Sequence, residues 1–85
     1  MKLYMKYLVT ARERTGKREE VVSLPAGSTL RDLSEWLQHT YGLEVPDPFL
    51  MATLNGRGWN QYPEALSTIL KEDDTVCLFP PISGG

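Results

Sequence analysis

The stretch that could most clearly take part in a chemical reaction is the C-terminal FPPISGG, residues 79–85. Gly84 and Gly85 carry no side chains, so they fit where nothing larger passes, and the last of them ends in a carboxylate. ATP can activate a carboxylate as an acyl-adenylate. A sulfur nucleophile then gives a thiocarboxylate, and a lysine amine gives an isopeptide. The alternative is a frayed chain end that happens to be glycine.

The length and the prolines of this segment favour insertion into a partner. The five residues from Pro81 to Gly85 reach roughly 17 Å when extended, at about 3.3–3.6 Å per residue. Pro80 and Pro81 set the exit direction and reduce the conformational freedom that binding would remove. We therefore predict one domain over residues 1–80 and a flexible, functional tail over residues 81–85.

The other reactive side chains do not form a catalytic group. Cys77 lies inside the strand-like run TVCLF, without a nearby histidine or glycine-rich turn, which favours a packing thiol over a nucleophile. His39 lies late in a helical segment and off its apolar face, which favours a solvated side chain near the helix end. One cysteine and one histidine cannot build a usual zinc site, so we expect no metal and no bound cofactor.

Three polar motifs also have simpler explanations than catalysis. The acidic pairs at 19–20 and 73–74 could act as acid–base carboxylates, but solvated loop charges are favoured. NGRG, residues 55–58, lacks the lysine and the helix of a phosphate loop. TARERTG, residues 10–16, carries two arginines that could contact an anion, and a polar turn explains them as well. Any chemistry is therefore expected at the tail.

The strands that must hold this tail are predicted mainly from the alternation of apolar and polar residues along the chain. Residues 2–10 alternate at period two and residues 18–24 are β-branched, which indicates an antiparallel hairpin around a polar loop at 11–17. Residues 50–55 form a third strand, closed by a tight Asn-Gly turn. Residues 75–79 form the last strand, which the two prolines stop.

One clear helix is predicted over residues 29–41. Thr29 and Asp32 have the spacing of a capping box, and Gly42 suits a left-handed C-terminal cap. The apolar face consists of Leu30, Leu33, Leu37 and Tyr41. The element order predicts an α+β fold in which this helix packs across a mixed sheet of four to five strands. If the first and last strands are central neighbours, the tail leaves from one end of the sheet.

The segment 57–74 carries no clear period. EALSTIL, residues 64–70, is compatible with a short helical turn, and KEDD, residues 71–74, with an acidic turn. Trp59 and Tyr62 either cap the edge of the core or form an exposed contact, and the pattern favours neither.

A docking surface follows from the phase of the strands. Val76 and Leu78 alternate with Cys77 and Phe79 in the last strand. If the first pair faces the helix, Phe79 faces outward at the root of the tail. Leu8 is out of phase with the other apolar residues of the first strand and would share this face. We favour this exposed patch over the reversed phase, which would bury both residues.

Composition restricts the class of protein. The chain has 85 residues, 41% of them hydrophobic, which suits one small globular domain. With a net charge of -2 and no basic stripe, we expect no nucleic-acid partner. No apolar run approaches the roughly 20 residues of a membrane span, and no secretory cleavage pattern is present. A single cysteine fits a reducing cytosol, so we expect a cytoplasmic protein that binds no membrane.

FPPISGG resembles the C-terminal signature of the small subunit of molybdopterin synthase, a ubiquitin-like sulfur carrier of the β-grasp fold. ARE at 11–13 with Gly16, LNG at 54–56 and the final LKEDDTVCLFPPISGG are similar to further segments of that family. The resemblance covers about the whole chain, and the tail is its most specific part. The segment 56–69 matches no family motif.

The resemblance implies a cycle in which the catalytic side chains belong to partners, so that this protein is no enzyme by itself. An adenylating enzyme similar to ubiquitin-activating enzymes would use ATP to activate Gly85, and a sulfur donor would convert it into a thiocarboxylate. The tail would then enter the large subunit of molybdopterin synthase, where two such sulfurs build the dithiolene that later holds molybdenum or tungsten. The inserted tail would comprise Pro80, Pro81, Ile82, Ser83 and Gly84.

Three other functions stay open. The chain could carry sulfur for thiamine thiazole or for cysteine synthesis, although both prolines favour molybdopterin. It could be a protein modifier that forms isopeptides with lysines, although Ser83 stands where ubiquitin has an arginine. It could also be a plain interaction module with an inert tail.

Overall fold

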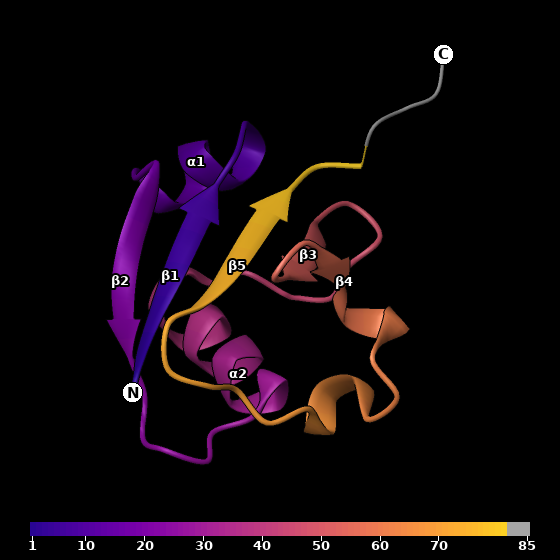
Figure 1. The fold of residues 1–85 in the computed structure, drawn as a ribbon. Helices are drawn as coiled ribbons and strands as arrows, with labels where there is room; N and C mark the ends of the chain where they lie inside the picture. The colour runs from indigo at the N-terminus through magenta and orange to yellow at the C-terminus, as the bar shows by residue number, and fades with distance from the viewer. Residues whose placement is uncertain (82–85) are drawn as a thin grey trace.

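Within residues 1–81, which the computed structural model describes, five strands form one mixed sheet and a helix crosses one of its faces (Figure 1). The elements are, in chain order, β1 (Lys2–Tyr7), α1 (Thr10–Thr15), β2 (Glu19–Ser23), α2 (Leu30–Tyr41), β3 (Met51–Leu54), β4 (Arg57–Gly58), the 3₁₀ turns η1 (Trp59–Gln61) and η2 (Ala65–Ser67), and β5 (Asp74–Phe79). The strand order is β2-β1-β5-β3-β4. The central pair β1–β5 is parallel and the other pairs are antiparallel, which confirms the predicted mixed sheet and the antiparallel first hairpin and makes the first and last strands central neighbours.

The helix α2 forms where its caps and its apolar period predicted it. The Thr29 side chain accepts a hydrogen bond from the backbone of Asp32, and the Asp32 carboxylate accepts one from the backbone of Thr29 at 2.8 Å. Gly42 closes the helix at φ 69°, a left-handed conformation that glycine adopts without steric cost. The buried face consists of Leu30, Leu33 and Leu37.

The first hairpin differs from the prediction in two respects. The strand predicted over residues 2–10 ends at Tyr7, because Val9 turns the chain with φ 51° and is exposed instead of facing the core. The loop predicted at 11–17 contains the short helix α1. Its one buried residue, Ala11, gives too little apolar pattern to reveal a helix, and Gly16 ends it in the left-handed conformation.

The segment 57–74 contains more structure than its sequence indicated. Asn55 and Gly56 both have positive φ, as the predicted tight turn requires, and the chain returns as the two-residue strand β4. The short helical turn predicted within 64–70 is η2. Trp59 is 3% exposed and belongs to the core. Tyr62 packs beside it, half-buried, which settles the open choice in favour of the core.

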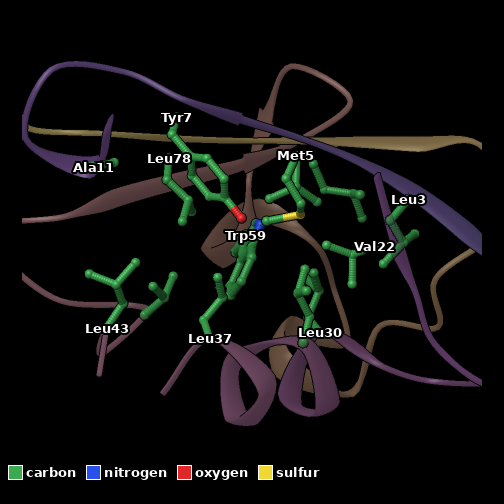
Figure 2. Packing of buried hydrophobic residues seen from close by; sticks show 14 of the residues in the cluster. Leu3, Met5, Tyr7, Ala11, Val22, Leu30, Leu37, Leu43, Trp59 and Leu78 are labelled. Atoms are coloured by element: carbon green, nitrogen blue, oxygen red, sulfur yellow. The ribbon is translucent and has the colours of Figure 1, made fainter. Parts of the chain in front are cut away.

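The core lies between the sheet and α2 (Figure 2). Leu3, Met5 and Tyr7 point from β1 toward α2, and Val76 and Leu78 do the same from β5. Burial of this apolar surface is the main force that fixes the phase of both strands. The intervening side chains must therefore face the opposite side of the sheet, called the outer face below. No helix in the described part of the chain is long and apolar enough to span a bilayer.

Candidate functional site

The root of the tail is the end of β5, the central strand of the sheet. β5 pairs with β1 on one side and with β3 on the other, so Phe79 ends a strand that is held along both edges. Figure 1 shows β1 and β5 ending at the same end of the sheet. Pro80 is half-buried and Pro81 is exposed. Four predicted tail residues lie outside the described residues: Ile82, Ser83, Gly84 and Gly85.

Leu8 and Phe79 lie side by side on the outer face at this root. Tyr7 is the register partner of Leu78, and the Leu8 backbone N–H donates to the Leu78 carbonyl at 2.9 Å. The next step of the register therefore sets Leu8 beside Phe79. Leu8 is 41% exposed and Phe79 is half-buried, whereas Leu78 is fully buried. The predicted strand phase is confirmed, and the role of this pair in binding a partner stays a prediction.

A third apolar residue of this patch was not predicted from the sequence. Met51 is the register partner of Phe79 on β3 and is 43% exposed. Its strand was predicted, but neither its pairing with β5 nor its register could be read from the chain. The patch thus spans three adjacent strands at the root of the tail.

Cys77 also occupies the outer face, where it is half-buried between two neighbouring strands. Its register partners are Lys6 on β1 and Thr53 on β3. The thiol thus packs on the sheet surface opposite the core. His39 is exposed in the last turn of α2, as predicted. Among residues 1–81, no three histidine, cysteine or acidic side chains gather closely enough to hold a metal ion.

A carboxylate network lies beneath the same end of the sheet. The Tyr7 hydroxyl donates to Glu20 Oε2 at 2.7 Å, and the Tyr41 hydroxyl donates to the same oxygen. Lys17 Nζ lies 3.3 Å from Glu20 Oε1. The prediction that both 19–20 carboxylates are solvated loop charges is therefore wrong for Glu20. This residue lies in β2, where it ties the ends of β1 and α2 together.

The network shifts the pKa values of its members. Burial raises the pKa of Tyr7 well above its ordinary value, and the hydrogen bond to Glu20 raises it further. Burial would also raise the pKa of Glu20, but the hydrogen bonds from Tyr41, Tyr7 and Lys17 outweigh it and hold this pKa below its ordinary value. Glu20 is therefore ionised at neutral pH and fixes the last residue of β1, directly before Leu8.

A groove of about 700 Å³ adjoins the patch on the β3 side. Its apolar lining includes Phe79 and Met51 from the patch, Pro48 from the loop before β3, and Trp59 and Leu66. Tyr62, at the end of η1, donates from its hydroxyl to the Leu54 carbonyl at 2.6 Å, which ties η1 to the end of β3. The root of the tail therefore adjoins a groove whose lining is largely apolar and joins the patch at Phe79 and Met51.

The chain is similar in fold to several solved structures. A protein from Pyrococcus furiosus described as subunit 1 of molybdopterin converting factor matches with a TM-score of 0.78 and 29% identity, over 95% of this chain and 98% of that chain. The small archaeal modifier protein 1 from Methanosarcina acetivorans matches with a TM-score of 0.75 and 25% identity, over 99% and 96%. In a complex of subunits 1 and 2 of molybdopterin-converting factor from Helicobacter pylori, the match has a TM-score of 0.69 and 22% identity over 100% of both chains.

These likenesses confirm the predicted β-grasp fold. The comparison with curated proteins gave no match. The family model described as the ThiS family matches residues 5–85, which run from within β1 through the outer-face patch to the end of the tail sequence. The chain therefore belongs to the ThiS family.

Proposed function

We propose that this protein is a sulfur carrier for the synthesis of molybdopterin and acts as the small subunit of molybdopterin synthase. Its reactive group is the Gly85 carboxylate. The residues of this chain present and orient that group, and the catalytic side chains belong to the partners. We expect this cycle to run in the cytoplasm, where ATP is supplied.

The observation that carries this proposal is the position of the tail on the fold. FPPISGG begins at the end of a central strand held along both edges, beside the apolar patch of Leu8, Met51 and Phe79. An exposed apolar patch of this kind marks a protein contact. A fixed root next to a contact surface suits a tail that must be delivered into a partner, and an inert chain end would need neither.

The proposed chemistry has two steps. A Gly85 carboxylate oxygen attacks the α-phosphorus of ATP on an adenylating enzyme, and pyrophosphate leaves. A donor then supplies sulfur at the oxidation level of sulfide, which attacks the acyl carbon, and AMP leaves with the carbon–oxygen bond electrons. The product is a thiocarboxylate, which the tail segment from Pro80 to Gly84 carries into the large subunit of the synthase.

The molybdopterin pathway is favoured by two observations. Both prolines of the molybdopterin synthase signature are present, and a 29% identical chain of the same fold is described as a molybdopterin converting factor subunit. A modifier that forms isopeptides is the second candidate, since a 25% identical chain is named a small archaeal modifier protein. Sulfur carriage for thiamine thiazole or cysteine keeps the same chemistry and changes only the recipient.

The mass of the chain tests the proposal. We expect protein isolated from its own cell to show a C-terminal peptide heavier by the replacement of one oxygen with sulfur. Deletion of Gly85 should abolish both this form and sulfur transfer to the large subunit, while the thermal unfolding curve stays unchanged. Transfer that survives the deletion would refute the mechanism. Branched peptides that carry this diglycine on lysines of other proteins would favour the modifier.

A further inference from the structure

Exposed apolar side chains gather at the end of the molecule from which the tail departs. Seven large apolar side chains are exposed among residues 1–81, and four of them lie where the chain leaves β1 or enters β3, the two strands that pair with β5. These four, called the apolar collar, are Leu8, Val9, Phe49 and Met51. Two follow β1 and two belong to the chain that enters β3, so the collar borders β5 on both sides. Figure 1 shows the loop before β3 at this end of the sheet.

Phe49 is the most exposed member of the collar, at 81%. The core does not require it, because its neighbour Leu50 supplies the buried contact of this loop. An apolar ring that stays in water contributes almost none of its burial free energy to folding. A partner that covered this ring would recover that free energy.

The loop that carries Phe49 is fixed by its own hydrogen bonds. The Phe49 backbone N–H donates to Asp47 Oδ1 at 2.8 Å, and the Leu50 N–H donates to the Asp47 carbonyl at 3.0 Å. Pro46 and Pro48 restrict the backbone on both sides of Asp47. The backbone at Phe49 is therefore held in place, which lowers the backbone entropy that a partner must remove on binding.

The short tail forces any enzyme that acts on Gly85 to approach this collar. The four residues beyond Pro81 span at most about 14 Å, at roughly 3.3–3.6 Å per residue. The reacting atoms of such an enzyme must lie within this distance of Pro81. Its surface around the tail entrance therefore covers the residues that flank the end of β5.

We propose that Phe49 anchors this protein on its adenylating enzyme by filling an apolar pocket beside the tail entrance. This inference rests on the proposed function and adds a contact outside the patch of Leu8, Met51 and Phe79. The adenylating enzyme is the first partner to use the tail, and it must recognise the chain before any sulfur distinguishes it. Recognition must then come from the surface of the domain, where the collar is the nearest exposed apolar feature.

ATP–pyrophosphate exchange by the purified adenylating enzyme of the same genome tests the anchor. We expect Phe49→Ser to raise the half-saturating concentration of this protein about 30-fold, the effect of losing a central aromatic contact, while the maximal exchange rate stays unchanged. The matched control is Ile69→Ser. Ile69 is also an exposed apolar residue, at 62%, but it follows η2 and pairs with Thr29 before α2, away from the collar. This control should behave as the wild type, and thermal unfolding should show both variants folded.

The outcomes separate this inference from the proposed function. Wild-type protein that supports no exchange would overturn both. Exchange that is normal for wild type and lost on deletion of Gly85, together with an unchanged half-saturation for Phe49→Ser, would overturn the anchor alone. Sedimentation provides a second check. A wild-type dimer that Phe49→Ser dissociates would assign the collar to a second copy of the chain and would also overturn the anchor.

Discussion

The two ends of β5 differ in how their side chains are used: those at the start form hydrogen bonds within the fold, and those around the end are exposed and apolar. At its start, Asp74 accepts hydrogen bonds from Asn55 Nδ2 at 3.0 Å and from the Lys71 backbone at 2.8 Å. Glu72 accepts from the backbone of Lys2 in the same region. The polar groups of this end are therefore used within the fold. The other end finishes at Phe79 among exposed apolar side chains that no described part of the chain covers.

This difference supports the proposal that the end of β5 binds another molecule. Side chains that accept hydrogen bonds from the backbone of a turn stabilise the folded chain without a partner. Exposed apolar side chains contribute little until a partner removes them from water. The start of β5 therefore contributes to stability, whereas its end is the part that we propose binds a partner, although both belong to one six-residue strand.

The largest difference is expected when two neighbouring residues near the end of β5 are truncated one at a time. Leu78 is fully buried, so Leu78→Ala should lower the free energy of unfolding by about 2–5 kcal/mol. Phe79 faces outward and is half-buried, so Phe79→Ala should cost roughly 1 kcal/mol or less. Urea denaturation measures both. In pyrophosphate exchange, Phe79→Ala should raise the half-saturating concentration of the protein. A large stability loss with unchanged half-saturation would mean that Phe79 packs instead of docking.

A smaller effect is expected at the start of the strand. Asp74→Ala removes the acceptor for Asn55 and for the Lys71 backbone, which should lower the free energy of unfolding by about 1 kcal/mol. Asp74→Asn keeps one acceptor oxygen and should recover part of this loss. Neither variant should alter the half-saturating concentration in pyrophosphate exchange. A change there would place the start of β5 in the docking surface and remove the contrast between the two ends.

Sequence patterns within single helices and strands predicted the features that depend on one element alone. The helix over 29–41 was predictable because its caps and its apolar period agree. The outward phase of Leu8 and Phe79 followed from period-two alternation, since burial of one set fixes the other. The short helix α1 was missed because Ala11 is its one buried residue, and β4 was missed because two residues carry no period.

The remaining features depend on contacts between distant parts of the chain. Glu20 and Tyr41 are 21 residues apart in the chain. The contact between β2 and the end of α2 cannot be predicted from either segment alone. Met51 joins the patch through its pairing with Phe79, which is likewise non-local. The exposure of Phe49 was unpredictable because its type suggests burial, and its loop carries no alternation that would orient it.

The Glu20 network lies at the same end of the sheet as the patch, but within the fold. We expect acid to lower the free energy of unfolding through this network, by less than the substitutions above. The pKa of Glu20 in the folded chain lies below its ordinary value of 4.5 because Tyr41, Tyr7 and Lys17 donate to its ionised form. A lowered folded pKa means that the unfolded chain binds the proton more tightly. The stabilisation is therefore complete above pH 4.5 and is lost as the pH falls through the folded pKa. Urea denaturation from neutral to acidic pH should show a steeper loss for wild type than for Glu20→Gln, which cannot take up this proton. Equal slopes would mean that Glu20 contributes nothing to stability as a carboxylate.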